Sequence, residues 1–145
     1  MNEAENNPDQ EKNKLAIFML VFILLIVFLV ILDANLHLIA NTWWYDVLLH
    51  ILGGTWIGTL FIYLFSYRRH FFDGKKNFLY SLAVIVGFAA LMGVLWELYE
   101  FGFDQTIGTN LSLPLTQPNL GDTMKDLLDD ILGGVIATLV YFFKK

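Results

Sequence analysis

The chain has 145 residues, 57% of them hydrophobic, and a mean hydropathy of +0.58, which is too apolar for an ordinary soluble domain. The length allows about four membrane spans. The net charge of −5 argues against a nucleic-acid partner, because binding a polyphosphate needs a basic surface. No cysteine is present, which excludes disulfides and thiolate metal sites. The composition therefore predicts one integral membrane domain of the all-α class.

The N-terminal segment combines a polar tail with an apolar run. Residues 1–14 are polar, contain Pro8 and lack an apolar period, so we expect a disordered tail. Residues 15–32 are apolar without interruption, as in a membrane span. A cleaved signal peptide is the competing interpretation, but the tail is acidic and no small-residue cleavage site follows. We therefore expect a retained first helix that faces lipid.

Further apolar segments predict three more spans, at 46–67, 78–101 and 122–143. Together with residues 15–32 they give a four-helix transmembrane domain over 15–143. In the connector 33–45, Trp43 and Trp44 are typical of an aromatic belt at the membrane interface. The loop 102–121 is long for a connector, and we expect an outer lid whose alternating apolar residues 107–115 form a short strand or an irregular flap.

The distribution of basic residues predicts the topology. Eight of the nine lie on one side of a four-span protein: Lys12, Lys14, Arg68, Arg69, Lys75, Lys76, Lys144 and Lys145. By the positive-inside rule both termini are then cytoplasmic, as expected for a multi-pass membrane protein with an even number of spans. Lys125 is the exception. The same topology brings the polar residues of the spans to their outer ends, so we expect these acids to meet in one leaflet.

An internal similarity links the second and fourth spans. Asp46-VLL-His50-IL-Gly53-Gly54 and Asp126-LLD-Asp130-IL-Gly133-Gly134 align without gaps, and the glycine pairs allow close helix contact. We interpret this as a parallel pseudo-repeat of two hairpins, with its axis along the membrane normal. Chance is the alternative, because Ile, Leu and Gly are common in membrane helices.

Metal-ligating residue types occur in pairs at helical spacing near the outer ends of three spans: Asp46 with His50, Glu97 with Glu100, and Asp126 with Asp130. Carboxylates with one imidazole suit Mg²⁺, Mn²⁺ or Ca²⁺, and also Zn²⁺. The pattern therefore predicts a divalent metal site formed by these six residues. In an enzyme, His50 or Glu97 would serve as the general base.

Structural interpretations compete with metal ligation. Asp46 and Asp122 could be N-caps that accept helix N–H bonds. His50 could be a core histidine bonded to Glu97 or Glu100. These two glutamates are the hardest to explain structurally, since we expect no Lys or Arg within the spans to pair with them.

Other acids have simpler interpretations. We expect Asp33 and Asp104 to be solvated loop residues. Asp129 and Asp130 are adjacent, so we expect only one of them to point inward, and Asp130 fits the repeat better.

Three functions are compatible with these features. The first is a divalent-cation site that acts on a phosphate-bearing lipid or a lipid-linked substrate, since such ions bridge carboxylates to phosphate oxygens. The second is a cation or proton transporter. The third is a non-catalytic module that binds membrane lipids or a partner through Trp43, Trp44 and the long loop. The oligomeric state does not follow from the sequence.

Three motifs carry a family resemblance: Trp44-Tyr45-Asp46-x3-His50-x2-Gly53-Gly54, Trp96-Glu97-x2-Glu100 and Asp122-x3-Asp126-x3-Asp130-x2-Gly133. Over residues 43–143 the chain resembles the YjdF-like family of small inner-membrane proteins and, more distantly, the VanZ-like proteins. The resemblance implies a multi-helix inner-membrane protein in which these acids and His50 are grouped together. The VanZ-like pattern has Gln where this chain has Glu100, and an Arg in the following loop that this chain lacks.

Overall fold

The computed structural model describes residues 8–111, 113 and 115–143, and its fold is all-α, as the sequence predicts. Four long helices make up most of it: α1 (Pro8–Leu36), α3 (Trp43–Ile62), α4 (Phe78–Phe103) and α6 (Leu120–Phe143). The short elements are α2 (Leu38–Asn41), α5 (Thr109–Leu111), the π-helical segments Tyr63–Arg68 and Asp104–Gly108, and a 3₁₀ turn at Gly74–Lys76.

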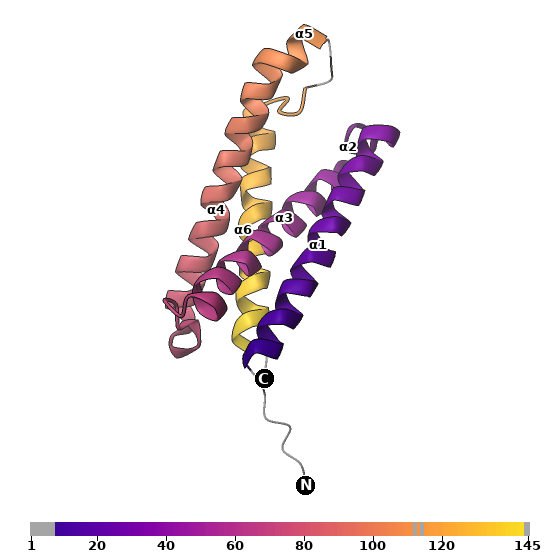
Figure 1. Cartoon of the computed structure of the whole chain (residues 1–145). Coiled ribbons are helices and arrows are strands. Elements are labelled where there is room, and N and C mark those ends of the chain that lie inside the picture. Colours follow the sequence, from indigo (N-terminus) through magenta and orange to yellow (C-terminus); the bar gives the residue numbers. More distant parts are fainter. Residues whose placement is uncertain (1–7, 112, 114, 144–145) are drawn as a thin grey trace.

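The four long helices alternate in direction. Figure 1 shows α2 and α5 at one end of the molecule and the C-terminal end of α6 at the other. The helix α6 packs most extensively on α3 and next on α4, while α1 packs on α3. The end of α4 and the starts of α3 and α6 therefore lie at the same end of the bundle, which is the end where the predicted acids occur.

The helix α1 begins earlier than predicted. Residues 8–14 are helical, so the expectation of a disordered tail is wrong for this segment. Proline suits the first turn of a helix because its missing N–H needs no partner there. Lys14 also pairs with Glu11 at 3.3 Å, one turn away. Residues 1–7 of the predicted tail lie outside the described residues.

Two hydrogen bonds attach α1 to α3. The indole N–H of Trp56 donates to the carbonyl oxygen of Met19 at 2.9 Å. The hydroxyl of Tyr45 donates to the carbonyl oxygen of Leu29 at 2.8 Å. Eleven side chains of α1 between Ile17 and Leu36 are exposed large hydrophobics. This agrees with the prediction of a first helix that faces lipid.

The connector between α1 and α3 is mostly helical. A left-handed residue, His37 with φ 52°, separates α1 from α2. Asp33 lies within α1 and accepts a 2.7 Å hydrogen bond from the amide of Ile39, so it is not the loop residue that was predicted. Trp43 is 82% exposed at the start of α3, a position suited to the membrane interface.

The predicted loop 102–121 begins as helix. The chain continues from α4 through the π-helical segment and α5 to Leu111, and no strand forms among the described residues of this loop. The helix can continue this far because the loop contains no helix-breaking proline before Pro114, and the alternation of apolar residues does not by itself end a helix. Only the stretch before α6 crosses back as a non-helical connection.

An aromatic core fixes the opposite end of the bundle. Phe61, Phe72, Ile85 and Tyr141 are buried there, and the Tyr141 hydroxyl lies 2.8 Å from that of Ser66. These residues come from α3, the loop that follows it, α4 and α6. The packing therefore holds the three helices in a fixed relation, which positions their polar ends.

The glycine pairs mark the closest contact between α3 and α6. A β-carbon on Gly54 would collide with the backbone of Asp130, and one on Gly133 would collide with the backbone of Ile51. The two similar motifs therefore meet, as the pseudo-repeat predicts. The symmetry of that repeat stays a prediction.

Within the described part of the chain, three helices are long and apolar enough to cross a membrane: Gln10–Leu36, Trp43–Arg68 and Phe78–Leu111. The helix α6 is long enough but carries Asp126, Asp129 and Asp130. All three are buried between the other helices, so they do not face lipid. A span by α6 is therefore compatible with its charges.

Candidate metal centre

The centre of the polar end is His50, on the second turn of α3. It is 8% exposed, and carboxylates from two helices surround it: Asp46 from α3, and Asp126 and Asp130 from α6. The contact at Gly54 brings these helices together, and helical spacing places the side chains on the facing sides. The polar residues predicted on the second and fourth apolar segments thus lie in one cluster between α3 and α6.

The distances in this cluster match the spacing of metal ligands. Nε2 of His50 lies 3.7 Å from Oδ1 of Asp46 and 3.9 Å from Oδ1 of Asp126. One ligand atom from each of these three residues lies within 4.8 Å of the other two. Ligands bind divalent cations at about 2.0–2.6 Å, which separates neighbouring ligand atoms by about 3–4 Å. The three residues could therefore hold one ion.

The second nitrogen of His50 faces another acid. Nδ1 lies 3.5 Å from Oδ2 of Asp130. A carboxylate in this position orients an imidazole and fixes which nitrogen is free to bind a metal. The alternative in which His50 is bonded to Glu97 or Glu100 is wrong in its partners, because the ring nitrogens pair with Asp46, Asp126 and Asp130.

Gly93 of α4 makes room for the Asp130 carboxylate. A β-carbon at this position would collide with Oδ2 of Asp130. Because α4 approaches so closely, Asp130 is enclosed by three helices. Its carboxylate is thereby held against the His50 ring.

Lys125 supplies a positive charge at the edge of the cluster. Its Nζ lies 2.7 Å from Oδ2 of Asp46, 3.1 Å from Oδ1 of Asp126 and 3.2 Å from Oδ1 of Asp122. The lysine side chain is 39% exposed, so it reaches the cluster from the surface. The ammonium of Lys125 therefore contacts two of the three candidate ligands, Asp46 and Asp126. The sequence analysis did not assign this partner to them.

Lys125 and His50 leave part of the negative charge uncompensated. Four buried carboxylate oxygens accept no hydrogen bond among the described residues. Oδ1 of Asp126 and Oδ2 of Asp130 have ion-pair contacts, with Lys125 and His50 respectively, whereas Oε1 of Glu97 and Oδ2 of Asp129 have no such contact in the described part of the chain. Burying such oxygens without a donor is unfavourable by about 1–3 kcal/mol each, and by more when they are charged. The cluster is thus suited to a further positive species.

Asp129 is buried as well as Asp130, so the expectation that only one of them points inward is wrong. The reason is that α6 lies between α3 and α4, which cover two sides of it. Adjacent residues on α6 can therefore both face protein.

The two predicted glutamates occupy different places. Glu100 lines a cavity together with Asp46 and His50. Glu97 is buried on the other side, where its Oε2 accepts a 2.7 Å hydrogen bond from the side-chain amide of Gln117. Three of the six predicted ligands lie within ligand distance of one another: Asp46, His50 and Asp126. Asp130 contacts the other ring nitrogen of His50, and the two glutamates lie outside this group.

The cavity beside the cluster has a volume of about 400 Å³. Its polar lining residues are Asp33, Asp46, His50, Glu100 and Thr116, while most of its remaining wall is apolar and comes from α1, α2, α3 and α4: Ile26, Val30, Ile39, Leu49, Trp96 and Phe103. A cavity whose wall combines charged and apolar side chains fits an amphipathic molecule.

Comparison with known families agrees with this architecture. Residues 9–145 match the family described as "Predicted membrane protein (DUF2238)". The chain belongs to this family. An uncharacterized protein of Thermotoga maritima is 30% identical over 112 residues, which cover 76% of this chain and 54% of that protein. The chain thus spans about half the length of this relative. No solved structure matches the sequence.

For this member of the DUF2238 family, the N-cap interpretations are wrong. The N-cap of α3 is Thr42, four residues before Asp46. The side chain of Asn119 precedes α6 and accepts a hydrogen bond from the amide of Asp122 at 3.2 Å. Both aspartates are therefore free to face Lys125 and the cluster.

Asp104 is a further residue whose role the sequence did not reveal. It is 3% exposed rather than solvated. Its Oδ1 accepts hydrogen bonds from the amide and the hydroxyl of Thr116, each 3.0 Å long, and its Oδ2 accepts one of 2.9 Å from the amide of Gln117. The signal in the sequence is its position one turn after Glu100, on the same face of a helix that continues past Gly102. Asp104 thus fastens the connection before α6 to α4.

Proposed function

We propose that this membrane protein binds a divalent cation through Asp46, His50 and Asp126, and binds the phosphate of a lipid or a lipid-linked molecule through that cation. The observation that supports the proposal most strongly is the convergence of these three ligands, two of which, Asp46 and His50, line a largely apolar cavity. Mg²⁺, Mn²⁺, Ca²⁺ and Zn²⁺ all accept such a ligand set.

The cation explains how an acidic cavity can accept a phosphate. Without it, the carboxylates of Asp46 and Glu100 would repel the headgroup. A divalent ion compensates two carboxylates and still has open positions for phosphate oxygens. The apolar wall formed by Val30, Leu49 and Phe103 would then contact the lipid chains.

Binding is better supported than catalysis. To act as a general base, His50 needs a ring nitrogen that can reach a substrate proton. Nε2 of His50 faces Asp46 and Asp126, and Nδ1 faces Asp130, so both nitrogens are directed at carboxylates. The catalytic role of His50, and the catalytic and ligand roles of Glu97, remain predictions from the sequence.

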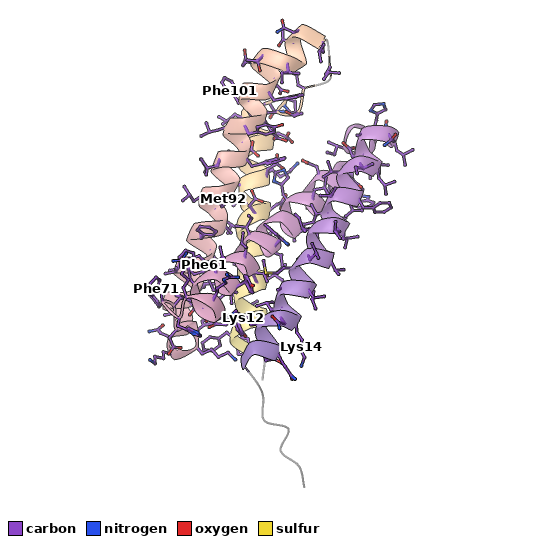
Figure 2. All side chains as sticks on the ribbon, viewed as in Figure 1. Lys12, Lys14, Phe61, Phe71, Met92 and Phe101 are labelled. Atoms are coloured by element: carbon purple, nitrogen blue, oxygen red, sulfur yellow. The ribbon has the colours of Figure 1, made fainter. Side chains whose placement is uncertain are left out.

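We also propose four spans with both termini in the cytoplasm. Figure 2 shows Lys12 and Lys14 at the end where α1 begins, opposite the end of α4 to which Phe101 belongs. The positive-inside rule assigns that lysine-bearing end to the cytoplasm, which puts the metal centre in the outer leaflet. The YjdF-like resemblance supports an inner-membrane location. A single cysteine at Asn110 should react with an impermeant reagent from outside and one at Lys76 should not; the reverse pattern would invert the topology.

A cation or proton transporter is the second candidate. Asp129 and Glu97 add two buried carboxylate oxygens that have no hydrogen-bond partner among the described residues and could accept a proton or a cation. Against a continuous path, Ile85, Ala137 and Thr138 are buried further along the α4–α6 contact and offer one hydroxyl among them. Uptake of a labelled cation by proteoliposomes that is lost in Asp126→Asn would establish transport in place of binding.

The proposal is tested by metal analysis of the protein purified in mild detergent. Asp126→Asn and His50→Gln should lower the bound divalent metal by at least about tenfold. Asp122→Asn is the matched control, since it makes the same change on α6 at a residue outside the ligand group, and it should retain the metal. Equal metal content in the parent and Asp126→Asn would refute the proposal.

A further inference from the structure

A second cavity lies on the other side of the bundle, between α4, α6 and the connection that precedes α6. Its volume is about 570 Å³. The apolar part of its wall includes Val94, Leu98, Phe101, Leu115 and Leu127, and Glu97 belongs to its polar part. None of these residues lines the cavity of the metal centre. The protein therefore has two distinct cavities, which share the helix α4.

This second cavity is bordered by side chains that face outward. Leu98, Phe101 and Leu120 line it and are all exposed large hydrophobics. In a membrane-spanning bundle such side chains contact lipid. An occupant of this cavity would thus enter from the bilayer.

Two buried acids line the cavity, and they differ in their hydrogen bonding. Both carboxylate oxygens of Asp104 accept hydrogen bonds from Thr116 and Gln117. Glu97 is 4% exposed, and only its Oε2 is bonded, to Gln117. Its Oε1 is buried without a hydrogen-bond partner in the described part of the chain. Both oxygens of Asp104 are thus already engaged, whereas Glu97 has one oxygen that can still accept a donor.

The protein's own cation at this end is engaged elsewhere. Nζ of Lys125 contacts Asp46, Asp122 and Asp126. A divalent metal is also poorly matched to Glu97, because Asp104 has no free oxygen to share with it and Glu97 is outside the group of converging ligands. A single open carboxylate oxygen in an apolar cavity is better suited to one N–H donor that carries a positive charge.

We propose that this cavity binds a bilayer lipid with a primary-amine headgroup, whose ammonium donates to Oε1 of Glu97. The apolar residues Val94, Leu98 and Leu127 would contact its chains. This site goes beyond the proposed metal function and does not depend on it, because it uses another cavity and another carboxylate.

Phosphatidylethanolamine and phosphatidylcholine with identical chains test the proposal. They share the phosphate, but only the first has ammonium N–H groups. Native mass spectrometry of the full chain, released from detergent with a metal chelator present, should show about tenfold higher retention of phosphatidylethanolamine, as one charged hydrogen bond would give. The chelator separates this result from any failure of the metal centre.

Variants locate the effect. Glu97→Gln removes the charge and should abolish the preference, and Val94→Phe, which fills the cavity and keeps the carboxylate, should lower retention. Glu100→Gln is the matched control on the same helix and should keep the preference, because it lines the other cavity. Equal retention of the two lipids by the parent, a preference that survives Glu97→Gln, or unchanged retention in Val94→Phe would overturn the proposal.

Discussion

The ammonium of Lys125 lies 2.7 Å from Oδ2 of Asp46, although 79 residues separate them in the chain. This contact joins α6 to α3 at the mouth of the acidic cluster. It also places a positive charge on a residue that we propose as a metal ligand. Lys125 therefore partly compensates the acids and competes with the ion.

Replacing Lys125 by methionine should strengthen cation binding. The substitution keeps the long apolar stem and removes the charge that contacts Asp46 and Asp126, so the affinity for Mn²⁺ should rise by about tenfold or more. Calorimetric titration in detergent measures it. Lys76→Met is the control, because this lysine pairs with Asp73 far from the cluster, at 2.9 Å. Weaker binding in Lys125→Met would show that the ammonium supports the site.

The contact between α3 and α6 predicts different effects for two adjacent glycines. Gly54→Ala places a methyl group against the backbone of Asp130 and should destabilise the fold by about 1–3 kcal/mol. At Gly53 a β-carbon meets nothing within 4 Å, so Gly53→Ala should be nearly neutral. Denaturant unfolding in mixed micelles compares the two. Equal stability of both variants would contradict the close contact.

A second pair of glycines tests the support of His50. Gly93→Ala should displace the Asp130 carboxylate and, through His50, weaken metal binding by about 10–100-fold. Gly87 lies on the same helix, and a β-carbon there meets nothing within 4 Å, so Gly87→Ala should bind as the parent does. Metal titration of both variants gives the answer. A Gly93→Ala protein of parental affinity would exclude a role for Asp130.

Asp104 should control the order of the connection before α6. In Asp104→Asn one oxygen no longer accepts hydrogen bonds from Thr116 or Gln117, and amide exchange of these two residues should accelerate by about 10–100-fold. Hydrogen-exchange mass spectrometry measures this rate. Thr106→Val is the control, because the Thr106 hydroxyl bonds to Gly102 within the helix. Unchanged exchange in Asp104→Asn would show that the connection is held by other contacts.

Helical periodicity and the glycine pairs were sufficient to predict the helices and the meeting of His50 with Asp126 and Asp130. These features depend on spacing along single helices and on which residues permit close contact. Both can be read from a sequence.

The errors arise where the environment of a residue depends on several elements. Asp129 is buried because α6 has neighbours on two sides, and Asp104 is buried because α4 continues beyond its predicted end. Lys125 reaches Asp46 through a long flexible side chain whose direction no periodicity specifies. Glu97 is directed to Gln117 by the course of a non-helical segment.

The central claim is that Asp46, His50 and Asp126 bind one divalent cation. Its most direct test uses Mn²⁺ as a paramagnetic probe and detects the imidazole nitrogen by electron spin-echo modulation. The parent protein should show a nitrogen bound directly to Mn²⁺, and this signal should disappear in His50→Gln. In Asp126→Asn the signal should be weaker because less Mn²⁺ is bound, and in Asp122→Asn it should persist. Bound Mn²⁺ without nitrogen modulation, or modulation that persists in His50→Gln, would contradict the claim.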